Sequence, residues 1–358
     1  MSSTCASPLC MGNRVPSKTR RMDALAHLLD SSFRRLDGIG SDPRSAFAAG
    51  HLVRLRRGFY VATPVWLKAL AHERFRMAVA AYARAHPGAV FCGETALFLH
   101  GLPVVKIPPT IDVAISSTTR LGTRPSTFVV QGDSDEARQA RKVPPPPVRR
   151  HHHAVSDFLT VGEFRTVPLA TAVVEVLTTA RFARSLTVAD GMLRRSVEDS
   201  LLEVSDVADL IARVPQRNRR ERAEAIAILA RKGAESPGES VSRALMHMFG
   251  FPEPVLQRPH WDSEGLIGRT DFAWDVAPSP VGEFDGWGKY FQKEMTGGED
   301  PREIIRREKR RENRLLALGY PVLRWEWADL ERPASFRAKL IQGGLSTGRS
   351  HPLARKFP

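Results

Sequence analysis

The stretch from Thr270 to Tyr290, TDFAWDVAPSPVGEFDGWGKY, constrains the fold more than any other part of the chain. It predicts two short strands joined by a proline-marked turn. Asp271 lies at the head of the first strand, and Glu283 and Asp285 lie on the second. Because side chains at i and i+2 of a strand point to the same face, we expect Glu283 and Asp285 to project together, away from Phe284. The segment therefore predicts a small sheet with three carboxylates at one end.

Carboxylates gathered in this way form a hard-oxygen site of the kind that Mg²⁺ or Mn²⁺ occupies, and such an ion keeps waters for phosphate chemistry. We therefore expect Asp271, Glu283 and Asp285 to be metal ligands. The pattern indicates metal-dependent cleavage of a phosphodiester bond.

The flanking segments predict a regular order of elements. Ser236, Pro237 and Glu239 form an N-cap with a capping box, which predicts a helix that runs to about Gly250. The remaining expected elements are a strand from Pro254 to Trp261, a helix from Pro301 to Ala317 and a strand from Val322 to Trp327. The predicted order is helix, three strands, helix, strand.

This order, with Glu239, Asp271 and Glu283-x-Asp285 at these places, resembles the PD-(D/E)XK nuclease fold and in particular the branch related to very-short-patch-repair endonucleases. The stretches EFDG..KY and EKRRENRLLALGYPVLRW carry the most specific likeness, and the resemblance covers residues 234–345. It implies an αβββαβ domain like that of restriction endonucleases, with magnesium-assisted hydrolase activity. Asp271 and Glu283 are its implied metal ligands.

The family's usual lysine, two residues after the glutamate, is replaced here by Asp285. The resemblance then implies that Lys289 or Lys309 supplies the missing cation, and that Asp285 is an extra ligand or a base.

The helix from Pro301 to Ala317 carries charge in an unusual place. At 100° per residue, three apolar residues define its expected buried arc: Ile305, Leu315 and Leu316. Glu308, Lys309 and Glu312 fall inside or beside that arc, where charged groups are costly unless they are paired or bound. Two interpretations stay open, namely internal salt bridges, for instance with Arg324, or a role in the site.

Two candidate assignments in this region also have ordinary alternatives. Glu239 is explained either by capping with a surface i,i+4 pair to Arg243, or by the place near the metal that the resemblance implies. Arg306 and Arg310, on the basic face of the second helix, are either solvated or contacts to a nucleic-acid backbone.

Residues 22–66 predict short helices over Met22–Leu29 and Asp42–Ala49, followed by an arginine-tipped hairpin. This order is typical of a winged helix-turn-helix, whose wing contacts phosphates. Three arginines are therefore candidate DNA contacts: Arg54, Arg56 and Arg57. The stretch LVRLRRGFYVAT is similar to the wing of AbiEi-type antitoxins, which regulate abortive-infection toxins. A small helical cap on the next domain is the alternative.

Residues 67–230 predict a mixed α/β middle domain, with a long helix from Leu67 to Ala85, a helix over Gly93–Pro103 and strands at Thr110–Ser116 and Thr127–Gln131. The TALFLHGLP stretch resembles the body of AbiEi-type proteins and implies a fold more than an activity. His151, His152 and His153 follow a proline-rich connector, and adjacent histidines on an extended chain cannot all face one metal. We expect a solvated loop there.

Composition sets the remaining bounds. The net charge of +14 over 358 residues favours a polyanionic partner, and we expect nucleic acid, with DNA favoured. Residues 1–21 predict a disordered basic tail, and no segment has the ~20 apolar residues of a membrane span. With three cysteines and no paired spacing, the chain predicts neither a disulfide framework nor a zinc site, and we expect it in the cytoplasm.

The sequence thus predicts an α+β multidomain protein and leaves two functions open. The first is a DNA-binding protein with a magnesium-dependent endonuclease domain, for which the resemblance implies a setting in phage defence or a toxin–antitoxin pair. The second is a non-catalytic AbiEi-type regulator that uses the nuclease-like domain only for binding. Because clustered acids repel phosphate unless a metal is present, their retention favours the first. The sequence specifies neither a partner toxin nor an oligomeric state.

Overall fold

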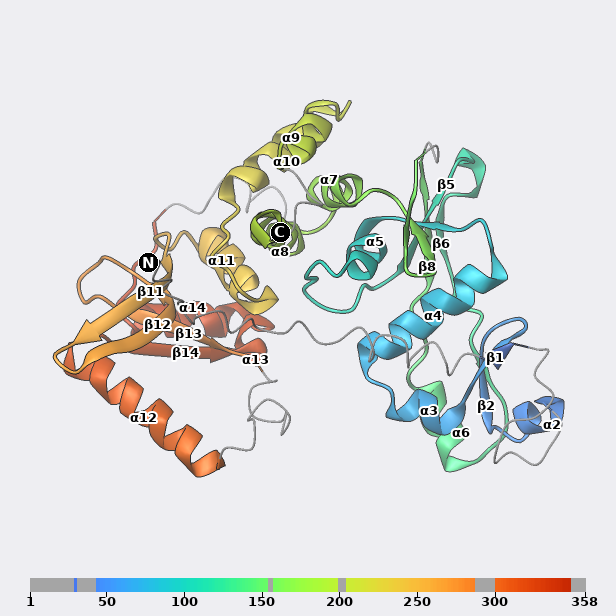
Figure 1. Cartoon of the computed structure of the whole chain (residues 1–358), viewed down its shortest axis with the longest axis horizontal. Helices are drawn as coiled ribbons and strands as arrows, with labels where there is room; N and C mark the ends of the chain where they lie inside the picture. Colours follow the sequence, from blue (N-terminus) through green and yellow to red (C-terminus); the bar gives the residue numbers. More distant parts are fainter. Residues whose placement is uncertain (1–28, 31–42, 154–156, 199–203, 287–299, 349–358) are drawn as a thin grey trace, which may run out of the picture. The chain divides into compact units, whose positions relative to one another are not determined.

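The computed structural model describes residues 29–30, 43–153, 157–198, 204–286 and 300–348, which fall into two units (Figure 1). The first unit comprises Met1–Ala89, Pro109–Ile111 and Arg120–Arg150, and the second comprises Val90–Pro108, Asp112–Thr119 and His151–Pro358. Helices and sheets occur in both, which confirms the α+β multidomain class. None of the described helices combines the length and apolar character that crossing a membrane requires.

The first unit is built on an antiparallel sheet in the order β1-β3-β2-β7. These strands are β1 (Leu29–Asp30), β2 (Leu52–Arg56), β3 (Phe59–Ala62) and β7 (Val129–Val130). Gly58, with φ +85°, permits the tight turn between β2 and β3. Both the hairpin and the helix expected over Asp42–Ala49, α2 (Pro43–Ala48), are confirmed. The helix expected over Met22–Leu29 lies outside the described residues except for Leu29, which belongs to β1.

The hairpin is part of a larger sheet, since β2 also pairs with the distant strand β7. The remaining elements of this unit are α3 (Thr63–Lys68), α4 (Ala71–Ala85), β6 (Gly122–Arg124), α6 (Asp135–Arg141) and the first part of β8 (Val148–His152), which pairs antiparallel with β6. The single helix expected over Leu67–Ala85 is wrong at its start. Ala69 and Leu70 are extended, and the Glu73 carboxylate accepts a hydrogen bond from the Leu70 amide (2.7 Å), so a new helix begins at Ala71.

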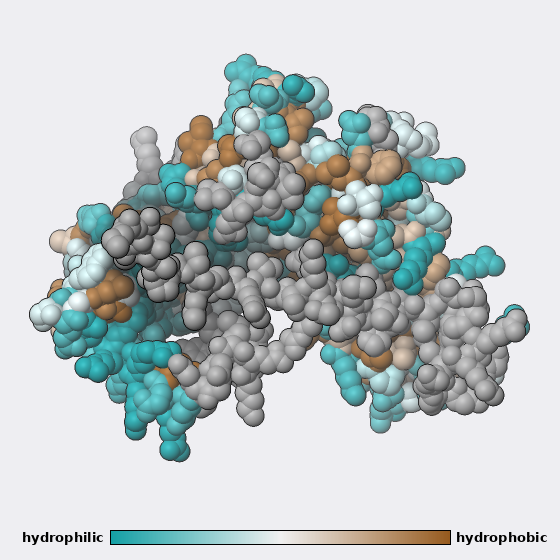
Figure 2. All heavy atoms as spheres, in the orientation of Figure 1, coloured by the Kyte–Doolittle hydropathy of each residue, from teal (hydrophilic) through white to brown (hydrophobic). Residues whose placement is uncertain are grey.

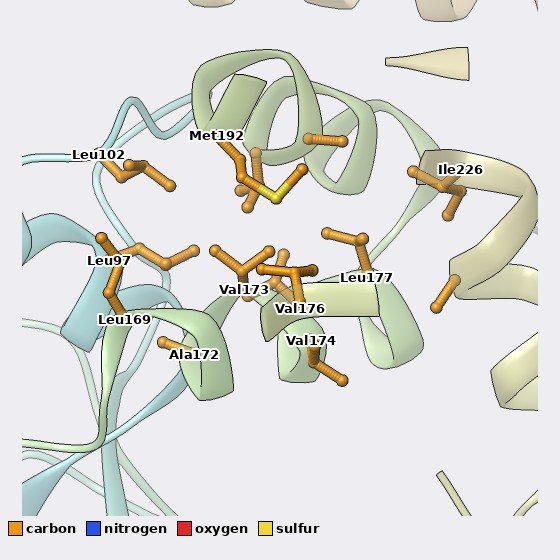
Figure 3. Packing of buried hydrophobic residues seen from close by; sticks show 14 of the residues in the cluster. Leu97, Leu102, Leu169, Ala172, Val173, Val174, Val176, Leu177, Met192 and Ile226 are labelled. Atoms are coloured by element: carbon orange, nitrogen blue, oxygen red, sulfur yellow. The ribbon is translucent and has the colours of Figure 1, made fainter. Parts of the chain in front are cut away.

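The second unit contains a small sheet covered by helices. β4 (Val90–Phe91) pairs antiparallel with β5 (Ile111–Ile115) and parallel with β10 (Phe164–Thr166), which pairs antiparallel with β9 (Leu159–Val161). Its helices are α5 (Gly93–His100), α7 (Leu169–Thr179), α8 (Phe182–Glu198), α9 (Val204–Ala212) and α10 (Arg217–Leu229). Figure 3 shows Leu97, Val173, Leu177 and Met192 meeting between these helices, where burial of apolar surface stabilises the fold.

The solvated loop expected at His151, His152 and His153 is wrong. His151 and His152 belong to β8, and the groups that face His151 and His153 are carboxylates. Nε2 of His151 lies 3.0 Å from Oδ1 of the buried Asp112, and His153 contacts the Glu175 carboxylate. These side chains are therefore paired within the structure and do not lie in a solvated loop.

The C-terminal part of the second unit has the expected order of helix, three strands, helix, strand. Its elements are α11 (Pro237–Phe249), β11 (Val255–Asp262), β12 (Gly265–Ala273), β13 (Val281–Asp285), α12 (Pro301–Ala317) and β14 (Val322–Glu326), followed by the short helices α13 (Trp327–Leu330) and α14 (Pro333–Gln342). The sheet order is β11-β12-β13-β14; β11, β12 and β13 are antiparallel, and β13 and β14 are parallel.

The two faces of this sheet are covered by different helices (Figure 1). Phe272 and Trp325 pack with residues of α11 and α14. Ala273 and Val281 pack with Leu315 of α12. Because neighbouring residues on a strand face opposite sides, Phe272 and Ala273 place α11 and α12 on opposite faces. The carboxylates of β13 therefore point towards α12.

Candidate active site

Glu239 lies in the first turn of α11 and is buried. The expected N-cap is confirmed, since the Ser236 hydroxyl accepts a hydrogen bond from the Glu239 amide (3.2 Å). The expected capping box is not formed, because the Glu239 carboxylate accepts a hydrogen bond from the Ser236 hydroxyl (2.7 Å) in place of the Ser236 backbone amide. The Glu235 amide donates another (2.8 Å). The expected surface pair with Arg243 is wrong, because Arg243 is buried and its guanidinium binds Asp190 at 2.6 Å.

Gln257 on β11 joins Glu239 to Asp271. Its Nε2 donates to Oε2 of Glu239 and to Oδ1 of Asp271, each at 3.3 Å. Its backbone has φ +52°, an uncommon conformation for a residue other than glycine that often marks a functional site. The other oxygen of Asp271 accepts a hydrogen bond from the Phe284 amide (2.9 Å), which holds this carboxylate beside β13. Two acids from different elements thus meet at one amide group.

This proximity has an electrostatic consequence for Glu239. Burial, and next the negative charge of Asp271, raise the pKa of Glu239 from 4.5 to about 7, against the hydrogen bonds from Ser236 and Glu235. At neutral pH Glu239 therefore either keeps its proton or carries a charge that repels Asp271. A cation placed between the carboxylates would relieve the same repulsion.

Glu283 lies on the α12 face of β13 and is held by two arginines. Oε1 lies 2.5 Å from Nη2 of Arg311, and Oε2 lies 2.9 Å from Nη2 of Arg324. Asp285 is 3.5 Å from Nη1 of Arg324, so Glu283 and Asp285 share one face as expected. Phe284 packs on the other face against Trp327. Burial raises the pKa of Glu283, and the two arginines oppose that rise.

The charges on α12 form internal salt bridges, which confirms one of the two interpretations. Nη2 of Arg324 lies 2.5 Å from Glu308 and 3.6 Å from Glu312, and Arg311 also bonds Glu308 (3.1 Å). Burial lowers the pKa of Arg324, but Glu308, Glu283 and Asp285 more than offset it and the pKa is raised.

The buried arc expected for α12 is wrong. Leu315 is 1% exposed, but Ile305 is 60% and Leu316 50% exposed. The helix turns Glu308, Arg311, Glu312 and Leu315 towards the sheet, at helical spacing, because β13 and β14 present charged partners there. Lys309 is consequently exposed and does not lie on the inner arc.

The other cations named from the sequence lie in different settings. Lys289 lies outside the described residues. Arg306 and Arg310 are exposed on α12 and pair with Glu303 (2.7 Å) and Glu264 (3.6 Å). Figure 2 shows mostly hydrophilic side chains on the visible surface of α12.

A divalent cation fits one part of this site better than the other. Glu239 and Asp271 bring hard oxygens from two elements to the same Gln257 amide. Glu283 has both oxygens bound to arginine. Across the described ranges, no group of three or more His, Cys, Asp or Glu side chains is placed to hold a metal ion. A third ligand would therefore require Glu283 to exchange an arginine.

Gln257 and Arg311 are the site residues that sequence reasoning missed. No local sequence pattern indicates Gln257, because the position of its side chain depends on a left-handed backbone conformation that the sequence does not predict. Arg311 had a signal, since it lies three residues after Glu308 on α12 and hence on the same face.

In the first unit, the three candidate DNA-binding arginines lie together. Arg54, Arg56 and Arg57 line one surface hollow at the β2–β3 hairpin.

Comparison with known proteins identifies no similar protein. No family model matches the chain, and no match is found among curated proteins or solved structures.

Proposed function

We propose that residues 234–345 form a metal-dependent phosphodiesterase that acts on nucleic acid, with DNA as the first substrate to examine. The observation that carries this proposal is the meeting of Glu239 and Asp271 at the Gln257 amide, where a bound cation would offset the repulsion between the two carboxylates. Glu239 and Asp271 would hold Mg²⁺ or Mn²⁺. Such an ion, when bound, polarises a phosphoryl oxygen and stabilises the leaving oxygen.

The chain's own residues have separate roles in this proposal. Gln257 orients the two acids. Arg311 and Arg324 take the place of the lysine that Asp285 displaces, because both are permanently charged and lie against Glu283. They would stabilise the charge that develops on the phosphate. Arg324 also has a buried Nε without a hydrogen-bond partner in the part of the chain that the structure describes.

The test is a cleavage assay of the full chain on duplex and single-stranded DNA and on RNA, with magnesium or manganese against a chelator. We expect metal-dependent cleavage that Asp271→Asn and Glu239→Gln each lower by about a hundredfold or more. Asp275→Asn is the matched control, because Asp275 is an exposed acid near the same end of β12 that pairs with Arg258. Equal loss in the control, or cleavage that the chelator does not affect, contradicts the proposal.

Arg311→Gln distinguishes our cation assignment from the alternatives at Lys309 and Lys289. It should lower cleavage by about a hundredfold while DNA binding is retained, since one cation among many contributes little to backbone affinity. If Lys309→Ala or Lys289→Ala abolishes cleavage and Arg311→Gln does not, the lysine assignment is right and ours is wrong.

A second candidate function is favoured by the double arginine contact of Glu283. These contacts neutralise the carboxylate without a metal, as a non-catalytic nucleic-acid-binding regulator would require. Under this alternative the full chain binds DNA, cleaves nothing with either metal, and shows no manganese binding in calorimetry. Manganese binding that is lost in Asp271→Ala plus Glu283→Ala contradicts it.

A further inference from the structure

A basic hollow in the first unit is separate from the candidate active site. It has a volume of about 710 Å³ and is formed by the β2–β3 hairpin and the end of α4. Its lining includes five basic side chains: Arg54, Arg56, Arg57, Arg84 and His86. None of the described residues that line it is acidic. The volume is sufficient for a phosphate with its attached sugar.

Arg56 is the unusual member of this set. It is half-buried, and its guanidinium lies over the Tyr82 ring, 4.6 Å from the ring centroid. Burial lowers the pKa of Arg56, Tyr82 partly opposes that change, and the charge of Arg150 adds to it. Within the described ranges, no carboxylate lies at ion-pair distance from Arg56. A desolvated cation without an anion is costly, so the hollow would gain stability from a bound anion.

The surroundings keep these cations in position. Arg54 lies over the Phe47 ring at 5.3 Å, and Tyr82 is itself stacked on His86 with ring centroids 4.3 Å apart. The last carbonyls of α4 point towards this end but are already occupied. The His86 amide donates to Tyr82 (3.0 Å) and Ala83 (3.2 Å), and the His86 ring contacts the Tyr82 carbonyl (3.1 Å). The hollow therefore offers guanidinium donors held in place by aromatic rings.

We infer that this hollow binds a terminal phosphate monoester, such as the phosphorylated end of a nucleic-acid strand or a nucleoside monophosphate. A monoester carries about −1.5 to −2 charges at neutral pH, whereas each backbone diester carries one, so the monoester better offsets a desolvated arginine. Arginine also matches phosphate with paired hydrogen bonds. A concave site admits a strand end more readily than the middle of a duplex. The inference does not depend on cleavage.

The test measures the affinity of the full chain for one oligonucleotide in 5′-phosphorylated and 5′-hydroxyl forms, with adenosine monophosphate and inorganic phosphate as further probes. We expect the 5′-phosphate to increase affinity by about tenfold or more. Arg56→Gln should abolish that preference, and Arg57→Gln, at an exposed position, should reduce it. Arg124→Gln, an exposed arginine on β6 of the same unit, should leave it unchanged.

Each outcome has a defined meaning. If the monophosphate binds as tightly as the phosphorylated strand, the hollow is a monoester site whose ligand is a free nucleotide. If only the strand binds tightly, the source is a nucleic-acid end. Equal affinity for the phosphorylated and hydroxyl strands, or a preference that Arg56→Gln and Arg57→Gln both retain, overturns the inference.

Discussion

Replacing Glu239 with glutamine should change how stability depends on pH. Burial and the charge of Asp271 raise the pKa of Glu239 from 4.5 to about 7, so the folded state keeps a proton that the unfolded chain has released above pH 4.5. The resulting stabilisation is complete below about pH 4.5 and is lost as the pH rises to about 7. Between about pH 5.5 and pH 7, at about 1.4 kcal/mol per pH unit, the loss amounts to about 2 kcal/mol.

The assay is urea unfolding of the full chain at about pH 5.5 and about pH 8, followed by tryptophan fluorescence, since Trp274 and Trp325 are buried in the same core as α11. As the pH rises over this range, the free energy of unfolding of the parent protein should fall by about 2 kcal/mol more than that of Glu239→Gln. Comparison with the variant cancels the contributions of histidines, which both proteins share.

Two further variants control the result. Glu175→Gln should also reduce the fall in the free energy of unfolding with rising pH, because burial raises the pKa of Glu175 to about 7 as well. Glu136→Gln, at an exposed position on α6, should change nothing. If Glu239→Gln keeps the full pH dependence of the parent, the pKa of Glu239 is not raised in the folded protein, and the reasoning from its burial and from the charge of Asp271 is refuted.

Three shorter predictions follow from packing and charge. Arg243→Met should lower the free energy of unfolding by about 3–5 kcal/mol, because it leaves Asp190 buried without its cation; a loss below about 1 kcal/mol in urea unfolding contradicts this. Gly238→Ala would place a Cβ 2.0 Å from the Phe284 ring and should cost about 1–3 kcal/mol or more, whereas Gly286→Ala, with 3.6 Å of space, should be tolerated in the same assay. Affinity for DNA should fall steeply with salt in a binding titration, because the chain carries +14 charges; an affinity that salt leaves unchanged refutes the polyanion interpretation.

Local patterns were sufficient where neighbours in sequence decide the structure. The N-cap at Ser236 predicted the start of α11, because its hydrogen bond to the Glu239 amide connects residues three apart. The alternation of Glu283, Phe284 and Asp285 predicted which side chains share a face, because the strand period is two. The same reasoning failed at Leu67–Ala85, where helical composition continues across a break at Ala69 that a single hydrogen bond to Glu73 helps define.

The sequence by itself determined the order of elements around the acids, the positive charge and the pattern of carboxylates on β12 and β13. Only the tertiary structure decided what each charge contacts. Glu239 is connected to Asp271 by Gln257, which lies eighteen residues from Glu239 along the chain and has a backbone in the left-handed region. Arg311 and Arg324 reach Glu283 from different elements. Helical periodicity placed the inner face of α12 on its apolar residues, but the sheet opposite presents Glu283 and Arg324. An apolar residue such as Ile305 at that face would leave these charges without partners, which is costly, so the charged residues of α12 face the sheet.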